Sequence, residues 1–515
     1  MIFNVLDYLE RSAASFPEKT AVVDDIKAYT YSQLLRLSKR IGSAVARFAA
    51  QGTPVAVLAD KSADTLAIFM GIVQAGCCYS LMNPDLPEGR LGQILSVLKP
   101  ALVITDEANA ELAEKLIAAA GAIPAPAPTI LLYDELMHHP LDEALLKKVR
   151  SRAIDQDPLY INFTSGSTGV PKGVAVGQRS VIDFIDIFAE TFGFDENDRI
   201  GNQAPFDFDV SVKDIYTALK VGATLVVIPK ALFSKPAELL DFICDQKVTN
   251  MTWAVSAICL ISACHGLDYR TPDTVKRVLF SGEVMPLKHL KTWMEHLPEA
   301  EFVNLYGPTE ITCNCTYHRV DRSRDYENGM PIGRPFPNED VFLLNKNGER
   351  IEEAGVTGEI CVRGTALALG YYAAEAETAK AFPQNPLQKA YPERIYRTGD
   401  LGKYDDAGEL IFCGREDFQI KYMGHRIETE EIEKAIAALP EIERCCVLFS
   451  EKKQKLYGFY AGDIDKRALH AKLKETLPVY MVPGAFRQLE QFPLTKNGKI
   501  DRKLLLSEVE TRSKR

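Results

Sequence analysis

The chain has 515 residues, of which 46% are apolar and 25% charged, and its net charge is −10 at pH 7. This length exceeds what one hydrophobic core normally supports, so two or more domains are expected. The negative charge argues against a general nucleic-acid or anionic-membrane binder, because both need a basic protein surface. We therefore expect a small-molecule substrate, no nucleic acid and no membrane insertion.

The cysteines and the N-terminus predict a cytoplasmic protein. Eleven cysteines include no CxxC pair and no Cys/His grouping at metal-ligand spacing, which is typical of a reducing compartment. Residues 1–7 carry acids and no basic segment leading into an apolar core, so no secretory signal is expected. The most apolar window, 66–82, is interrupted by Gln74 and Ser80, which favours a buried helix-to-strand passage over a membrane span.

The first part of the chain has the pattern of an α/β domain. Between residue 31 and about residue 356, helical patterns such as 32–48 alternate with short β-branched runs at 55–58, 101–104 and 223–228. Such alternation predicts parallel or mixed sheets covered by helices.

The pattern changes after Gly358, where short strands with glycine and aspartate turns predict a small β-rich subdomain. Its expected strands are 359–363, 399–404 and 409–413. The last hundred residues predict a small α+β domain with helices at 428–438 and 466–477 and strands around 445–448 and 456–460. The predicted fold class is thus α/β, with a large N-terminal domain followed by a small mobile lid.

A hydroxyl- and glycine-rich loop, TSGSTGVPKG at 164–173, directly follows the apolar run 159–163. Glycines let the backbone approach an anion, the hydroxyls and N–H groups donate, and the lysine adds positive charge. A solvated turn is the alternative, and the loop does not match GxxxxGK[ST] because no hydroxyl follows the lysine. We predict phosphate binding by Thr164, Ser165, Gly166, Ser167, Thr168, Gly169 and Lys172.

Six further segments follow in order: FDVS (208–211), NLYGPTE (304–310), GEI (358–360), YRTGD (396–400), GRED (414–417) and NGKIDR (497–502). Together with the loop, and across nearly the whole chain, they resemble the adenylate-forming superfamily, specifically the amino-acid adenylation domains of nonribosomal peptide synthesis. NQAPF (202–206) and SGEVMP (281–286) look most like the stand-alone ligases that load D-alanine onto a carrier protein.

The resemblance implies a reaction in two halves that uses ATP and Mg²⁺. A carboxylate attacks the α-phosphorus of ATP to give an acyl-adenylate and pyrophosphate, and a carrier's phosphopantetheine thiol then captures the acyl group. Lys499 would be the catalytic lysine, Glu310 would bind Mg²⁺ and Thr309 would touch the α-phosphate. Adenine and ribose would contact Gly282, Glu283, Asn304, Tyr306, Asp400 and Arg415.

These residue types also have ordinary structural roles. An aspartate after Thr-Gly, as at Asp400, is often a turn residue, and Glu310 could be a helix-start carboxylate. Tyr306 could be a core aromatic and Lys499 a solvated surface lysine. The complete series of motifs favours the functional interpretation.

The resemblance also implies two domains, 1–416 for ATP and substrate and 417–515 for a lid that carries Lys499. Asp417 would be the hinge about which the lid swings between two poses. The second pose would withdraw Lys499 and bring Gly424 towards a pantetheine tunnel.

The substrate is expected to carry an amine. At the position of Asp209, amino-acid-activating relatives pair an aspartate with the substrate's α-ammonium group, and a buried carboxylate without a cation would be costly. The resemblance places the pocket at Asp209, Val210, Lys213, Leu279, Ser281, Leu305, Cys313 and Asn314.

Three positions depart from the relatives. The D-alanine ligases have an apolar residue at Lys213 and a cysteine at Ser281, which argues against D-alanine, and many relatives have a histidine at Gln178. Lys213 could pair with an acidic or polar substrate, extend its stem to water, or bond Asp214.

The acyl acceptor is expected to be a separate carrier protein, because the chain has neither a GGxS carrier motif nor an HHxxxDG condensation motif. An acyl-CoA or aryl-acid ligase of the same fold is the rival enzyme, and it would not need Asp209. An inactive nucleotide-binding homologue is the rival outside catalysis. The presence of Lys172, Glu310, Asp400, Arg415 and Lys499 argues against that rival.

Overall fold

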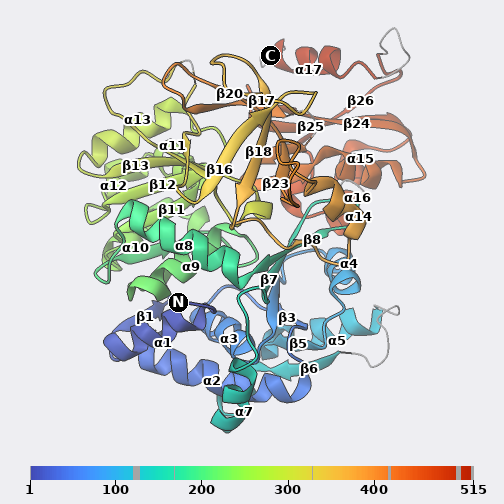
Figure 1. The fold of residues 1–515 in the computed structure, drawn as a ribbon. Helices are drawn as coiled ribbons and strands as arrows, with labels where there is room; N and C mark the ends of the chain where they lie inside the picture. The colour runs from blue at the N-terminus through green and yellow to red at the C-terminus, as the bar shows by residue number, and fades with distance from the viewer. Residues whose placement is uncertain are drawn as a thin grey trace.

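Two large sheets organise the N-terminal part of the computed structural model (Figure 1). The structure describes residues 2–119, 128–166, 169–327, 329–415, 419–493 and 500–511. The seven-stranded sheet has the order β19-β8-β7-β4-β3-β5-β6. Its strands are β3 (Pro54–Leu58), β4 (Cys78–Met82), β5 (Leu102–Thr105), β6 (Thr129–Leu132), β7 (Pro158–Thr164), β8 (Lys172–Gly177) and β19 (Gly370–Tyr371). β3 to β7 are parallel, and β8 returns antiparallel to β7.

The nine-stranded sheet has the order β15-β14-β13-β12-β11-β9-β10-β1-β2. Its strands are β1 (Thr20–Val23), β2 (Ala28–Thr30), β9 (Arg199–Asn202), β10 (Thr224–Val227), β11 (Asn250–Ala254), β12 (Arg277–Ser281), β13 (Glu301–Tyr306), β14 (Thr316–Arg319) and β15 (Arg334–Pro335). The central strands β1, β10, β9, β11, β12 and β13 are parallel. The carboxyl ends of β12 and β13 therefore meet at one edge of the sheet, where ligands of α/β proteins usually bind.

Helices cover both sheets. Those of the N-terminal part are α1 (Leu6–Ser15), α2 (Tyr31–Phe48), α3 (Ala63–Gln74), α4 (Glu88–Leu98), α5 (Ala110–Ala119), α6 (Tyr133–Met137), α7 (Glu143–Arg150), α8 (Gln178–Phe192), α9 (Val210–Val221), α10 (Pro236–Asp245), α11 (Val255–Ala263), α12 (Gly266–Tyr269), α13 (Leu287–His296) and α14 (Glu375–Ala381). Every residue of α3 is buried, and β4 follows it. The apolar window 66–82 is thus the predicted buried helix-to-strand passage, and among the described residues no helix is long and apolar enough to cross a membrane.

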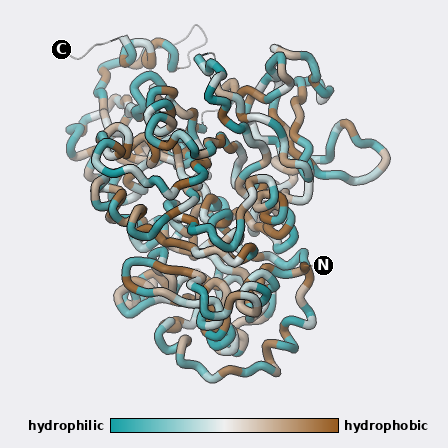
Figure 2. Tube along the Cα trace, turned by 90° about the vertical axis from the view of Figure 1, so that its left-hand side faces the viewer, coloured by the Kyte–Doolittle hydropathy of each residue, from teal (hydrophilic) through white to brown (hydrophobic). Residues whose placement is uncertain are grey.

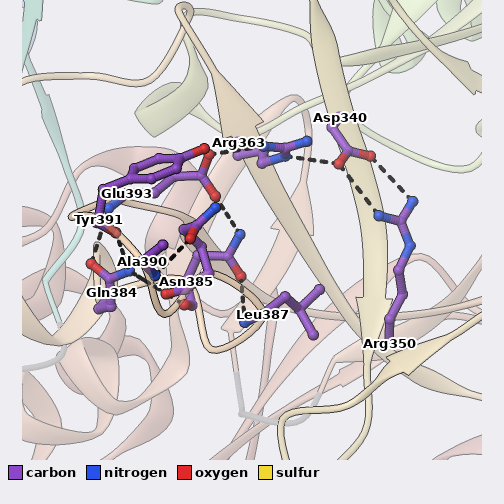
Figure 3. Close-up of polar contacts among 10 residues, drawn as sticks. Asp340, Arg350, Arg363, Gln384, Asn385, Leu387, Ala390, Tyr391 and Glu393 are labelled. Carbon is purple, nitrogen blue, oxygen red and sulfur yellow. Dashed lines mark hydrogen bonds and ion pairs between the residues drawn. The ribbon is translucent and has the colours of Figure 1, made fainter.

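A smaller antiparallel sheet of order β17-β16-β18-β20-β21 forms the predicted β-rich subdomain. Its strands are β16 (Glu339–Leu344), β17 (Arg350–Ile351), β18 (Gly358–Gly364), β20 (Tyr396–Tyr404) and β21 (Leu410–Arg415). Figure 3 shows Arg363 of β18 between two carboxylates: it donates to Asp340 (2.9 Å) and to Glu393 (2.8 Å). This network ties the sheet to the loop that precedes β20, the strand that carries Asp400.

The C-terminal part begins with a hairpin of β22 (Gln419–Tyr422) and β23 (His425–Glu428). A three-stranded sheet of β24 (Ile442–Ser450), β25 (Lys455–Gly462) and β26 (Ala485–Gln488) follows, with helices α15 (Thr429–Ala437), α16 (Lys466–Thr476) and α17 (Arg502–Thr511). It has apolar clusters of its own, including Ile427, Ile432 and Leu456 in one and Phe459, Leu505 and Val509 in another. It lies at the upper right of Figure 1.

The predicted α/β architecture is confirmed, and each predicted helix and strand range quoted above overlaps an observed element. Brown and teal segments alternate along much of the trace in Figure 2, as expected where surface helices bury one face. The predicted domain boundary at 416/417 falls within residues 416–418, which lie outside the described residues.

Candidate functional site

A cavity of about 340 Å³ lies where both large sheets, the β-rich subdomain and the C-terminal hairpin meet. Its wall combines residues far apart in sequence, from Leu81 at the end of β4 to Tyr480. The predicted site residues that line it are Thr164, Ser165, Asp209, Val210, Ser281, Gly282, Thr309, Cys313, Asn314, Asp400 and Arg415. The hydroxyl-rich loop and the motifs FDVS, NLYGPTE, YRTGD and GRED therefore each contribute residues to one cavity.

The predicted ribose site is built by two neighbouring strands. Asp400 of β20 lies opposite Arg415 of β21 in the sheet, so the side chains form a buried ion pair. The other carboxylate oxygen of Asp400 accepts a hydrogen bond from the Tyr306 hydroxyl (2.6 Å). The Lys421 ammonium lies 5.1 Å from the centre of the Tyr306 ring, and burial lowers the pKa of Lys421.

Asn304 and Glu283 lie near this group but have other partners. The Asn304 amide donates to the carbonyl of Pro331 (2.8 Å). The Glu283 carboxylate accepts from the Gly424 N–H (2.9 Å), and burial raises the pKa of Glu283. Of the three predicted adenine-edge residues, only Gly282 lines the cavity, whereas Asn304 is bound to the core and Glu283 to the C-terminal hairpin.

The predicted phosphate loop joins β7 to β8, and Thr164 and Lys172 are cross-strand partners at its base. A side chain on Gly166 would come within 2.1 Å of the Val170 carbonyl oxygen, so the turn requires glycine there. The Lys172 ammonium lies 5.5 Å from the centre of the Tyr371 ring. Ser167 and Thr168 lie outside the described residues, as do Lys499 and Asp417.

Asp209 begins α9 at the cavity wall. Burial raises the pKa of its carboxyl, while a hydrogen bond from the Thr309 side chain and the charge of Lys213 oppose that rise. The Cys313 thiol donates to the Asp209 carbonyl (2.8 Å), and Cys313 has a φ of +79°, an uncommon conformation for a residue with a side chain. The segment after the NLYGPTE motif is thus bound to the start of α9.

Lys213 lies one turn further along α9 and is completely buried. Its ammonium donates to the Asn314 side-chain oxygen (2.5 Å), so the alternatives of a solvated stem and a bond to Asp214 do not describe this side chain. Leu279 and Leu305 are also buried and belong to the main apolar cluster behind the cavity wall. Gln178 accepts from the backbone N–H of Val5 (3.0 Å), which is a structural role at the start of α8.

Glu310, the predicted magnesium ligand, is 1% exposed in the short helix η3 (Thr309–Ile311). One carboxylate oxygen accepts from Arg426 of β23 (2.8 Å) and the other from the Tyr371 hydroxyl (2.7 Å). Burial alone would raise the pKa of Glu310, but the Arg426 guanidinium and the Tyr371 hydroxyl hold it below its ordinary value.

Magnesium usually takes one or two carboxylates and completes its shell with phosphate oxygens and water. Among the described residues, no group of three or more His, Cys, Asp or Glu could hold a metal by itself. Glu310 is a single carboxylate that is ionised and already paired with the cation Arg426. Such a group suits a magnesium ion whose other ligands are nucleotide phosphates and water. Glu310 therefore fits the predicted role, provided that Arg426 leaves it.

The C-terminal part also contacts the phosphate loop. Glu431 of α15 accepts from the Gly166 N–H (3.2 Å) and from Arg90 of α4 (2.5 Å). The Ser165 hydroxyl donates to the Arg426 carbonyl (2.8 Å). In this pose the Glu431 carboxylate therefore occupies the Gly166 N–H, a donor that the phosphates of ATP are predicted to use.

The sequence analysis missed four charged residues of this site: Lys421, Arg426, Glu431 and Arg90. Arg426 lies two residues beyond Gly424, which was predicted to approach the pantetheine tunnel, and Lys421 precedes both in the same hairpin. Arg90 and Glu431 are 341 residues apart, so no local pattern could have paired them.

Residues 9–372 match the family model described as AMP-binding enzyme, and residues 431–499 match the AMP-binding enzyme C-terminal domain. The chain belongs to the AMP-binding enzyme family. It is an adenylate-forming ligase related to the adenylation domains of nonribosomal peptide synthetases, as predicted.

Among the relatives of this AMP-binding enzyme is tyrocidine synthase 3 of Brevibacillus parabrevis, 31% identical over 96% of this chain but only 7% of that protein. Zwittermicin A synthase ZmaJ of Bacillus cereus is also 31% identical, over 96% of this chain and 93% of ZmaJ. The Vibrio cholerae adenylation domain AlmE, solved with glycyl-adenosine-5'-phosphate, has the same fold, with a TM-score of 0.84, 23% identity and coverage of 99% and 98% of the two chains.

Proposed function

We propose that this enzyme activates an amino acid as its aminoacyl-adenylate and then transfers the aminoacyl group to the phosphopantetheine thiol of a separate carrier protein. The observation that carries the amino-acid part is Asp209, a residue that lines the same cavity as Thr309, Asp400 and Arg415. A carboxylate there can bind an α-ammonium group while the substrate's own carboxylate faces the nucleotide. A plain aryl or fatty acid offers it no cation.

In the adenylation half, Asp400 accepts the ribose hydroxyls, with Arg415 beside it, and Tyr306 stacks on adenine. Gly282, Glu283 and Asn304 lie along the base edge, and Thr309 contacts the α-phosphate. Residues 164–172 hold the outer phosphates, and a magnesium ion held at Glu310 would neutralise part of their charge. Lys499, from the C-terminal domain, contacts the substrate carboxylate and the α-phosphate, where negative charge accumulates.

The thiol half uses a second pose of the domain 417–515, which swings about Asp417. The contacts described above support this assignment: Arg426 holds Glu310, and Glu431 holds the Gly166 N–H. Both contacts compete with magnesium and phosphates, so this pose fits the step after pyrophosphate has left. Gly424 then lines the cavity beside Ala254, where its lack of a side chain leaves room.

Amino-acid-dependent exchange of labelled pyrophosphate into ATP tests the first half. We expect exchange with amino acids and not with aryl acids, and a loss of at least roughly 100-fold in Lys499→Ala, because one aligned charge commonly contributes that much. Lys503→Ala is the matched control, since Lys503 is exposed on α17. Aryl-acid exchange would overturn the role of Asp209, and exchange in Lys499→Ala at the wild-type rate would overturn that of the lysine.

Comparing acceptors tests the second half. A phosphopantetheinylated carrier protein and free coenzyme A are each offered to the enzyme with ATP and the amino acid that supports exchange. We expect a thioester on the carrier. A thioester formed on coenzyme A alone would favour the acyl-CoA ligase alternative.

A further inference from the structure

We infer that the substrate of this enzyme is an amino acid whose side chain ends in a carboxylate, and that Lys213 binds this second carboxylate. The inference rests on the proposed function, because it concerns the side-chain end of the same amino-acid site. The observation that carries it is a completely buried ammonium group with a neutral hydrogen-bond partner.

Lys213 is incompletely paired. An ammonium group has three N–H donors, yet among the described residues the structure gives it one hydrogen bond, to the Asn314 side-chain oxygen, and no ion pair. Burial lowers the pKa of Lys213, while the more distant Cys313, Asp209 and Asp214 oppose that effect. A buried cation of this kind is costly unless a carboxylate reaches it.

The nearby carboxylates have other partners. Asp214, the next residue of α9, accepts from the Asn202 amide (3.0 Å), and the charges of both Lys213 and Lys61 oppose the rise of its pKa on burial, but the structure describes no ion pair between it and Lys213. Asp209 is the proposed partner of the substrate's α-ammonium group. Once the α-ammonium group binds, Lys213 would have to share the negative charge of Asp209 with it.

An acidic side chain restores the balance, because two carboxylates then face two ammonium groups: Asp209 faces the α-ammonium, and the substrate side chain faces Lys213. With a neutral side chain, Lys213 and the α-ammonium group would have to share Asp209, because the substrate's own α-carboxylate faces the nucleotide.

The pocket wall next to Lys213 supplies further donors. Asn314 lines the cavity and accepts from Lys213 through its side-chain oxygen, so its amide N–H groups are the donors it can offer to a ligand. Ser281 lines the same cavity. An amide, a hydroxyl and an ammonium together suit a carboxylate better than an apolar side chain.

Pyrophosphate exchange tests the inference with aspartate and glutamate, in both L and D forms, against asparagine, glutamine, alanine and serine. Aspartate and asparagine, like glutamate and glutamine, are nearly equal in size, so each pair isolates the charge. We expect one acid to exceed its amide roughly 100-fold or more in kcat/KM, because a site built for a polar group strongly rejects an analogue that lacks it. The better of the two acids gives the length of the side chain.

Lys213→Met keeps the length of the side chain and removes the charge. We expect it to lower kcat/KM for the acid roughly 100-fold and to abolish the preference over the amide. Lys220→Met on the same helix is the control and should keep the preference, since Lys220 pairs with Asp186 away from the cavity. Thermal unfolding and Mg·ATP binding of each variant separate a lost preference from a lost fold.

The outcomes distinguish the two proposals. Exchange with alanine or serine but with neither aspartate nor glutamate overturns this inference and leaves the proposed function intact. An unchanged preference for the acidic amino acid in folded Lys213→Met does the same. Exchange with aryl acids alone, or with no acid of any class, overturns the proposed function and this inference with it.

Discussion

Arg426 occupies the carboxylate that magnesium would need, so its contact belongs to only one of the two half-reactions. It neutralises Glu310 with a hydrogen bond of 2.8 Å, and its own side chain is only 20% exposed. The same carboxylate is the proposed magnesium ligand. A guanidinium and a divalent cation cannot both occupy this position, so Arg426 belongs to the pose in which magnesium and pyrophosphate are absent.

Replacing Arg426 should therefore separate the two half-reactions. We expect Arg426→Met to slow thioester formation roughly 10- to 100-fold, since breaking a buried pair leaves Glu310 uncompensated, while pyrophosphate exchange stays near the wild-type rate. Rapid-quench assays of both steps measure this. Arg467→Met, at an exposed position of α16, should alter neither step. Equal loss in both half-reactions of Arg426→Met would contradict the assignment.

His425 gives the docked pose a pH dependence. It stacks on Tyr480 of its own domain and meets the edge of Phe208 across the interface. Burial, with a contribution from the charge of Lys230, lowers the pKa of His425 from 6.5 to about 4. The docked pose therefore binds fewer protons than a free lid with an ordinary histidine. Its stability is complete above pH 6.5 and declines as the pH falls towards 4.

At pH 5.5 docking should be roughly tenfold weaker than at pH 7.5, since one pH unit below the free pKa corresponds to a factor of ten. The ratio of the thioester-forming rate to the exchange rate, followed between pH 5 and 8, measures the effect. His425→Gln, which cannot gain a proton, should flatten this ratio. The same decline in the variant would assign the pH dependence to another group.

At the level of helices and strands, periodicity predicted the elements well. The pattern at 32–48 became α2, and the apolar window became α3 and β4, because burial on one or all sides leaves a direct trace in the sequence. The ends of elements were less exact: the run predicted at 399–404 is part of the longer β20, which begins at Tyr396. Pairing with β18 extends β20 towards its N-terminus. The residues of one strand do not by themselves determine where it pairs with another.

The same limit applies to the hairpin of β22 and β23. Its alternating residues are compatible with a solvent-exposed ribbon, yet Lys421 lines the cavity and Arg426 reaches Glu310. The positions of these two charges depend on where the C-terminal domain docks. The local pattern contains no information about that.

A disulfide between the two domains tests whether the pose seen here excludes adenylation. A side chain at Gly424 would lie 3.2 Å from the Cβ of Ala254, close to the Cβ separation of about 3.8 Å in a disulfide. We expect oxidised Ala254→Cys/Gly424→Cys to lose pyrophosphate exchange, because Glu431 and Arg426 would stay on the phosphate loop and on Glu310, and dithiothreitol should restore it.

Each single cysteine variant is the control for this crosslink, since native Cys264 and Cys413 are exposed thiols. Mass spectrometry confirms the bond. If the crosslinked enzyme exchanged pyrophosphate as fast as the reduced one, the pose described here would be compatible with adenylation, and the proposed alternation would be wrong.

The sequence by itself determined the family, the α/β class and the segments that meet at the cavity, because motifs and periodicity are local properties of the chain. It also singled out Asp209 and Lys213. Only the tertiary structure decided what surrounds them: that Lys213 is buried against Asn314, that Arg426 pairs with Glu310, and that Glu431 reaches both Arg90 and Gly166. Burial and pairing arise between segments hundreds of residues apart, and their energies depend on the surrounding dielectric and charges, which exist only in the folded chain.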